Sequence, residues 1–232
     1  MTGAPGFRCA IAPRAPICRA LSWGLGVVTI ALSLRVVADT ARYLSFEPHF
    51  GFLLERPLLS ADRLWLACFY VHVAGGTICL VSAPLLLWNG LTGRSIRLHR
   101  AIGRVHAVAA LGWTGPTGLY LAPFAKGGLA GRIGFLVLGV AFCASTVLGV
   151  LAIRRRDLRR HVAWMLRSYA LILSAVTFRV LHLALHGLGV APEPAYVVCT
   201  WSSLALALAA GEFMIRWFGR AAASSAVAGD MP

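Results

Sequence analysis

The chain has 232 residues, of which 59% are hydrophobic and only 13% are charged, and its mean hydropathy is +0.76. Soluble domains carry about 25% charged residues, so this composition argues against a soluble fold and for a protein that crosses a membrane several times. The formal net charge of +14 does not indicate nucleic-acid binding, because the basic residues cluster between long apolar runs.

Six apolar runs are long enough to cross a bilayer, whose core of about 30 Å needs roughly 20 residues of helix. In chain order they are residues 18–38, 64–87, 101–121, 133–153, 163–186 and 196–213. Lipid offers no partner to backbone polar groups, so each run is predicted to be a helix. The predicted fold is all-α: a polytopic membrane protein with six transmembrane helices.

The domain organisation follows from these runs. Residues 1–17 are expected to form an N-terminal cytoplasmic tail and residues 18–217 a single six-helix membrane domain. Residues 218–232 consist mostly of small side chains and are expected to form a disordered C-terminal tail.

The distribution of arginine predicts the orientation. Arginines gather near the N-terminus, in the loops before the third and fifth runs, and after the sixth run. Basic residues in short loops stay in the cytoplasm, so both termini are predicted to be cytoplasmic, as an even number of spans requires. The same clusters are expected to contact anionic membrane lipids rather than nucleic acid. Nothing in the sequence indicates the oligomeric state.

The fifth run carries a polar face. At 100° per residue, five of its polar residues fall within about 60° of one another: His161, Ser168, Arg179, His182 and His186. Arg179 lies roughly 24 Å from the cytoplasmic end by helical rise. A buried arginine at this depth needs a partner, which is expected to be an anion or a ring of carbonyl groups.

Two other runs also carry histidines. The third run aligns His99 and His106, and its "TGPTG" segment is expected to kink the helix and free a carbonyl. The second run places His72 beside Gly75 and Gly76, a face of small side chains that suits either a close helix neighbour or a flat macrocycle.

These positions suggest b-type haem. His72 and His182 lie toward the outer surface, at depths that would allow them to be the two axial ligands of one haem iron. His99 or His106 with His161 would form a second, inner pair. Arg179 outside would then neutralise haem propionates, and so would the inner cations Arg100, Arg104 and Arg160. The hypothesis predicts transmembrane electron transfer between a quinone or other redox partner and an external acceptor.

Other interpretations remain open. A histidine within a span often does no more than hydrogen-bond a neighbouring helix. The arginines and histidines could instead hold an anionic lipid, a quinone or a small anion in a binding or transport module without a redox cofactor, or the protein could be a structural subunit. Glu212 is expected to pair with Arg216 one turn later, and Arg167 to extend toward the cytoplasmic interface.

Three segments resemble a known family: "HVAGG" at His72–Gly76, "LHRAIGR" at Leu98–Arg104 and "HVAWMLRSYALILSAVTFR" at His161–Arg179. The family is the bacterial multi-pass membrane group called domain of unknown function 2306, and the likeness covers about residues 64–185. It implies location in the bacterial cytoplasmic (inner) membrane but no established reaction. It also implies that these residues belong to a shared pattern: His72, His99, Arg100, Gly103, Arg104, His161, Trp164, Arg167, Ser168, Tyr169 and Arg179.

A looser resemblance is to helical bundles of the cytochrome b and ferric-reductase type, which carry histidines at both membrane faces. The chain departs from the four-ligand layout of those proteins, because its fourth run contains no histidine. This departure favours one outer haem over two.

Overall fold

The computed structural model describes residues 16–47, 50–93 and 95–229, and every regular element within them is helical. Most of the predicted N-terminal tail, His49, Arg94 and residues 230–232 lie outside the described part. The elements, in chain order, are α1 (Pro16–Ala41), η2 (Arg42–Ser45), η3 (Gly51–Leu53), α2 (Pro57–Ser60), α3 (Arg63–Thr92), α4 (Ile96–Val108), η4 (Ala109–Thr114), α5 (Gly115–Leu121), η5 (Ala122–Phe124), α6 (Gly128–Arg154), α7 (Leu158–Gly187) and α8 (Pro192–Gly229).

Within the described residues, four helices are long and apolar enough to cross a membrane. They are Arg63–Gly90, Gly128–Arg154, Leu158–Gly187 and Pro192–Trp217, which match the second, fourth, fifth and sixth predicted runs. The prediction of an all-helical, polytopic membrane protein is therefore confirmed. The first and third predicted runs correspond to α1 and to the consecutive segments α4, η4 and α5, which are not among the four.

Local signals explain where the long helices begin. Asp62 caps α3, its carboxylate accepting hydrogen bonds from the backbone N–H groups of Leu64 and Trp65. Ser95 caps α4 and Asp157 caps α7 in the same way. Short polar residues thus satisfy the free N–H groups at the helix starts, where the chain enters a span.

The C-terminal helix extends beyond the sixth predicted run. α8 does not stop near residue 217 but continues as helix to Gly229. The segment after Trp217 is "FGRAAASSAVAG", and its alanines have the highest helix propensity of any residue. A helix already nucleated in the span can therefore continue through this segment.

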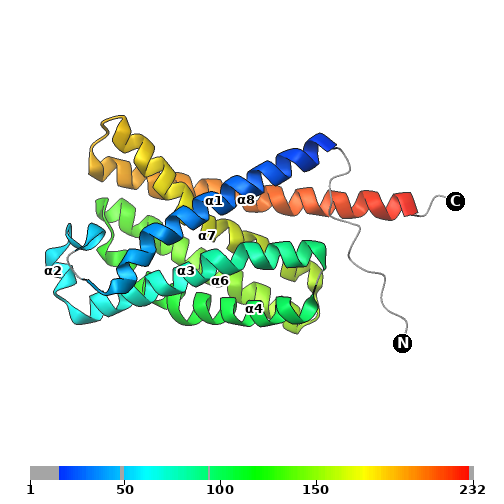
Figure 1. Cartoon of the computed structure of the whole chain (residues 1–232), viewed down its shortest axis with the longest axis horizontal. Helices are drawn as coiled ribbons and strands as arrows, with labels where there is room; N and C mark the ends of the chain where they lie inside the picture. Colours follow the sequence, from blue (N-terminus) through cyan, green and yellow to red (C-terminus); the bar gives the residue numbers. More distant parts are fainter. Residues whose placement is uncertain (1–15, 48–49, 94, 230–232) are drawn as a thin grey trace.

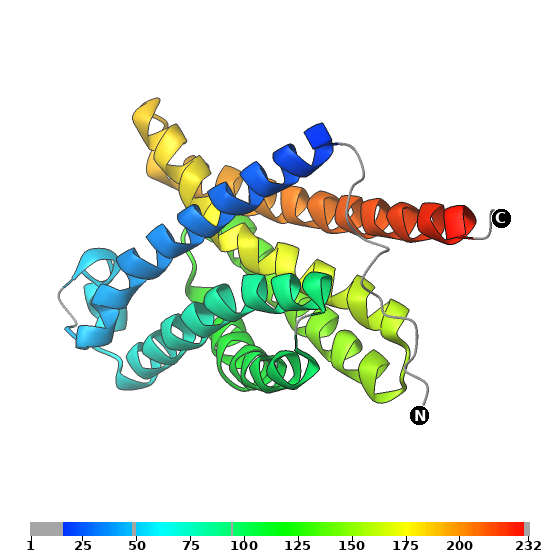
Figure 2. The same cartoon turned by 45° about the vertical axis from the view of Figure 1, so that its right-hand side comes forward.

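The helices form a bundle with two parts (Figure 1). α6, α7 and α8 pack together, and α3 packs against α4, η4 and α5. α1 crosses the bundle obliquely and contacts α3 and α7. In both views the hairpin of α7 and α8 diverges from the end of α3 that follows α2 (Figures 1 and 2). The start of α1, the end of α8 and the turn between α6 and α7 lie at the opposite end of the molecule.

Two clusters of buried side chains hold the bundle together. The larger lies between α3, η4, α6, α7 and α8 and contains Cys79, Leu80, Ala109, Ala110, Phe142, Leu171, Val176 and Leu204. The smaller is aromatic, joins the segment η2–α2 to α3, and is built from Leu53, Trp65, Phe69 and Tyr70 with Tyr43, Phe52, Tyr120 and Phe124 around them. The aromatic cluster covers the end of the bundle where α3 begins.

The third predicted run is distorted in its middle. Ala109–Thr114 form a π-helical turn, and Pro116 follows directly in the first turn of α5. Proline lacks the N–H that a regular helix would use at this point, which explains why the hydrogen-bond pattern widens. This agrees with the distortion expected at "TGPTG". Such π turns frequently occur at functional sites.

Candidate functional site

One face of α3 gathers polar and small residues along the whole span. His72, Gly75, Cys79, Ser82 and Asn89 follow one another at intervals of three, four or seven residues, so they share one side of the helix. α4, η4 and α5 pack against α3. We call these five residues the α3 polar face. Its histidine and serine make the contacts to the neighbouring helix described next.

His72 is held by the start of α5. Its Nδ1 lies 3.0 Å from the carbonyl oxygen of Thr114. A carbonyl only accepts hydrogen bonds, so the neutral ring carries its proton on Nδ1 and keeps a lone pair on Nε2. A Cβ added to Gly118 would stand 2.9 Å from Cε1 of His72, so only glycine allows the ring to lie here.

The small-residue face beside His72 is filled by protein. A Cβ added to Gly75 would stand 2.6 Å from Oγ1 of Thr114 and 3.0 Å from Cβ of Trp113, whereas one added to Gly76 would meet nothing within 4 Å. Gly75 therefore serves close helix packing. Of the two uses that the sequence allowed for this face, a helix neighbour occupies it at Gly75.

His106 lies deeper in the same interface. It is 2% exposed, and Nδ1 is 2.8 Å from the hydroxyl of Ser82. That hydroxyl also lies 2.6 Å from the carbonyl of Ile78, to which it donates its proton. The Ser82 oxygen must then accept a proton from Nδ1 of His106, which leaves the lone pair of this ring on Nε2, as in His72.

At the end of the bundle where α4 and α7 begin, two further histidines approach each other. His161 donates from Nδ1 to the carbonyl of Gly149, 2.8 Å away. His99 lies against the carbonyl of Leu86 and within electrostatic range of His161. Nδ1 of His99 is buried without a hydrogen-bond partner among the described residues. The predicted inner histidines thus come from separate helices to one region.

Arg179 lies on the C-terminal half of α7 and is exposed there. One guanidinium nitrogen donates to the carbonyl of Ala175, 3.0 Å away, on the preceding turn of the same helix. No carboxylate of the described residues forms an ion pair with it. Arg179 has five N–H donors, so this single bond to its own helix leaves most of its binding capacity for another partner.

Two tyrosines and a histidine lie within electrostatic range of Arg179. Tyr196 of α8 and Tyr43 of η2 lie within its electrostatic range, and so does His72. Tyr196 is also within range of a second cation, Arg56, whose side chain donates to the carbonyl of Phe124. We call Arg179, Tyr196, Tyr43 and His72 the outer cluster. It joins four elements that are far apart in the chain.

The acids that could neutralise the outer cluster have other partners. Asp39 is within range of Arg179 but pairs with Arg35 on its own helix at 3.2 Å. Glu193 accepts from the backbone N–H of Gly127, and Glu55 pairs with Lys126. Neither Asp39 nor Glu193 forms an ion pair with Arg179. The outer cluster therefore contains one guanidinium without an ion pair among the described residues, together with hydroxyl groups that can donate hydrogen bonds.

His182 belongs to a different environment from His72. Its ring stacks on Phe178 with 5.9 Å between centroids and an interplanar angle of 10°, and it meets Tyr196 edge-on at 5.6 Å. His182 thus packs against α8, whereas His72 packs against α5. Tyr196, which touches His182 and lies near Arg179, is the residue that links the two environments.

Arg104, the predicted inner propionate partner, lies away from the histidines of its own helix. It is exposed and lines a shallow groove with Val105, Val108 and Ala109. His106 faces the opposite direction, toward Ser82 of α3. Side chains two positions apart on a helix differ by about 200° around its axis, which explains why Arg104 and His106 point in opposite directions.

Sequence reasoning missed a second set of polar contacts on α7. Arg167 binds Glu212 of α8 at 2.6 Å and covers the ring of Trp164 at 4.5 Å. The expectation that Glu212 pairs with Arg216 is therefore wrong, because α8 packs antiparallel to α7 and presents Glu212 to Arg167. Ser168 is fully buried and hydrogen-bonds Thr146 of α6 at 2.8 Å. The motif "WMLRS" was the available signal for both contacts.

The described residues contain no group of three or more histidine, cysteine or acidic side chains placed to hold a metal ion. A metal held only by protein side chains in the usual three- or four-ligand arrangement thus has no site among them. The arrangement offers instead imidazoles with free Nε2 atoms and an arginine with free donors.

The fold and these contacts define a polytopic helical membrane protein with polar groups inside its bundle. The chain belongs to the family described as "Predicted membrane protein (DUF2306)", whose model matches residues 69–215, more than half of the chain. No curated protein and no solved structure matches the chain. The family description assigns no reaction, so any function has to be argued from the contacts above.

Proposed function

We propose that this protein binds the anionic head group of a membrane amphiphile, a phosphate or carboxylate, at the outer cluster. One observation carries the proposal: Arg179 lies within a span, exposed, and without an ion pair among the described residues. An arginine in the centre of a span costs about 2.5–3.5 kcal/mol or more. Such a residue persists where a partner offsets that cost.

The neighbours of Arg179 suit an anion. The phenols of Tyr196 and Tyr43 can donate hydrogen bonds, and Arg56 adds a second positive charge near Tyr196. Arginine binds phosphate and carboxylate through two parallel hydrogen bonds, which makes it more selective than a point charge. The tail of the amphiphile would lie along the exposed apolar surface of α7, which includes Val180 and Leu183.

Binding can be measured with dodecyl phosphate as the probe, titrated into the detergent-purified protein and followed by its thermal stabilisation. Arg179→Gln should weaken binding at least tenfold, and Arg179→Lys should weaken it less, because the charge remains but the fork of donors is lost. Arg132→Gln is the matched control, since Arg132 is an exposed arginine near the start of α6. Equal binding by the Arg179→Gln and Arg132→Gln variants would refute the proposal.

A second candidate function is electron transfer through a bound b-type haem. What favours it is the tautomer of His72, whose Nδ1–H···O=C bond to Thr114 leaves Nε2 available for iron, as in many metal-binding histidines. His182 would supply the other axial ligand, which requires both rings to leave the packing described above. A Soret and α band in protein purified from haem-replete cells, lost in His72→Ala, would support this function; colourless protein would refute it.

We also propose six spans with both termini in the cytoplasm of a bacterial inner membrane. The proposal adds α1 and the continuous helix α4–η4–α5 to the four apolar helices. It is supported by the arginines at one end of the bundle, where short basic loops favour the cytoplasmic side: Arg97, Arg100, Arg154, Arg155, Arg156, Arg159 and Arg160. Reporter fusions after residues 126 and 217 should report the outer and the cytoplasmic side respectively.

A further inference from the structure

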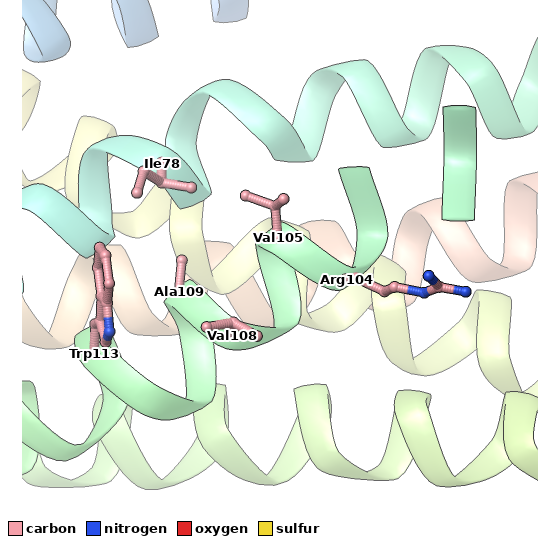
Figure 3. A pocket seen from close by; sticks show the side chains of 6 residues that line it. All are labelled: Ile78, Arg104, Val105, Val108, Ala109 and Trp113. Carbon is pink, nitrogen blue, oxygen red and sulfur yellow. The ribbon is translucent and has the colours of Figure 1, made fainter. Parts of the chain in front are cut away.

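A groove runs along the outside of the bundle between α3 and the consecutive segments α4 and η4. Its volume is about 280 Å³, and it is lined by Ile78, Arg104, Val105, Val108, Ala109 and Trp113. Figure 3 shows Arg104 at one end and the Trp113 indole at the other, with the aliphatic side chains between them. The outer cluster shares no residue with this groove.

The groove has the dimensions of a stretch of hydrocarbon chain. A cavity of about 150 Å³ can hold a benzene ring, so 280 Å³ holds an extended run of methylene groups. Trp113 follows Arg104 by nine positions, which corresponds to about 13 Å by helical rise. Between these two ends the lining side chains are aliphatic, so the guanidinium of Arg104 and the indole N–H of Trp113, at the two ends, are the hydrogen-bond donors among the lining side chains.

The positive charge of Arg104 indicates which head group the hydrocarbon chain in the groove carries. The Arg104 side chain extends away from the aliphatic residues, toward the end of the bundle where α4 begins (Figure 3). It forms no ion pair among the described residues. Arg97 and Arg100 stand seven and four residues earlier, on the same side of α4. This stripe of guanidinium groups leads from the membrane surface to the mouth of the groove.

We propose that the groove binds one acyl chain of an anionic phospholipid, whose phosphate is held by Arg104. The lipid belongs to the leaflet in which the arginine-rich ends of α4 and α7 lie. The ring of Trp113 limits how far the chain extends along α3. The lipid would cover the lipid-facing side of the α3–α4 contact and so stabilise the interface that holds His106 and Ser82.

The proposal is tested by native mass spectrometry of delipidated protein to which phosphatidylglycerol or phosphatidylcholine is added back. The wild-type chain should retain phosphatidylglycerol preferentially. Arg104→Gln should weaken its retention by about tenfold, as expected for the loss of a charged hydrogen bond, and Arg97→Gln should change it by less than threefold. Arg97 is the control because it lies on the same stripe but outside the groove.

A second variant tests the groove itself. Val105→Trp fills the space between α3 and α4, and Val105 is 56% exposed, so the fold should tolerate the larger ring. Val140→Trp, at a 53% exposed position of α6, is the matched control. Loss of phosphatidylglycerol in the first variant alone supports the proposal. Equal retention in both variants, equal retention of the two lipids by the wild type, or displacement of the lipid by decylubiquinone would overturn it.

The two binding proposals can fail separately. Arg179→Gln should leave phosphatidylglycerol retention at the groove unchanged, and Arg104→Gln should leave the Arg179-dependent part of dodecyl phosphate binding unchanged. Size-exclusion chromatography and circular dichroism identify any variant that has not folded. If Val105→Trp fails this check, Val108→Trp, at a 61% exposed position, replaces it.

Discussion

The contact between His72 and Gly118 makes a quantitative prediction. In Gly118→Ala the new methyl group would stand 2.9 Å from Cε1 and 3.1 Å from Nδ1 of His72. The ring has to move, and its bond to the Thr114 carbonyl is strained or lost. Overpacking costs about 1–3 kcal/mol, and an interhelical hydrogen bond in a membrane is worth about 0.6 kcal/mol, at most about 1.7. We expect Gly118→Ala to destabilise the protein by about 2–3 kcal/mol.

A double-mutant cycle separates this contact from a general effect of the substitution. His72→Ala removes the ring, so a methyl group at position 118 then meets empty space. In that background Gly118→Ala should cost less than about 0.5 kcal/mol, which gives a coupling energy of about 2 kcal/mol between the two sites. Unfolding by sodium dodecyl sulfate in mixed micelles, followed by circular dichroism, measures each corner of the cycle. Additive costs would refute the packing of His72 on Gly118.

Neighbouring glycines of α3 provide the control. Gly75→Ala should be destabilising, because its Cβ would stand 2.6 Å from Oγ1 of Thr114, whereas Gly76→Ala meets nothing within 4 Å. Alanine has the higher helix propensity, so Gly76→Ala should be neutral or slightly stabilising. If both variants behave alike, the rotation of α3 about its axis is not the one described.

Three further substitutions test other polar contacts by the same unfolding assay. Ser168→Val removes a fully buried bond to Thr146 and should cost about 1–2 kcal/mol; no loss would mean that the hydroxyl groups do not pair. Glu212→Gln weakens the ion pair with Arg167. The side chains of Glu212 and Arg167 are 45% and 26% exposed, so the loss of stability should stay below about 1 kcal/mol and shrink with added salt. A loss that does not depend on salt would contradict the ion pair. Ser82→Ala strands the Nδ1–H of a buried histidine and should cost about 1–3 kcal/mol; a neutral result would contradict the tautomer assigned.

Much of the architecture follows from the sequence alone. Long apolar runs separated by arginine clusters predict membrane-spanning helices, because the need to satisfy backbone hydrogen bonds in lipid depends on composition over about 20 residues and not on distant contacts. The distortion at "TGPTG" and the caps at Asp62, Ser95 and Asp157 are likewise local signals. The motifs around His72, His99 and His161 also indicate the family, because each is a short pattern of residue types along the chain.

The sequence also indicated which residues are polar within the spans, but not what they touch. Helical periodicity placed Ser168 and Arg179 on one face of α7, yet the first is buried against Thr146 and the second is exposed. Periodicity gives the direction of a side chain from its own helix axis. It contains no information on which helix lies in that direction at a given depth, and the C-terminal half of α7 diverges from α3 (Figure 2).

Partner identity was therefore decided by the tertiary structure. Glu212 has a basic residue within one turn of its own helix, but the antiparallel packing of α8 on α7 brings Arg167 closer. Gly75 and Gly76 are adjacent in sequence, yet a close helix neighbour meets only the first. Composition and helical periodicity determined that the chain crosses a membrane and which faces of its helices are polar. The packing of the helices determined which of those polar groups meet, because it arises from contacts between residues far apart in the chain.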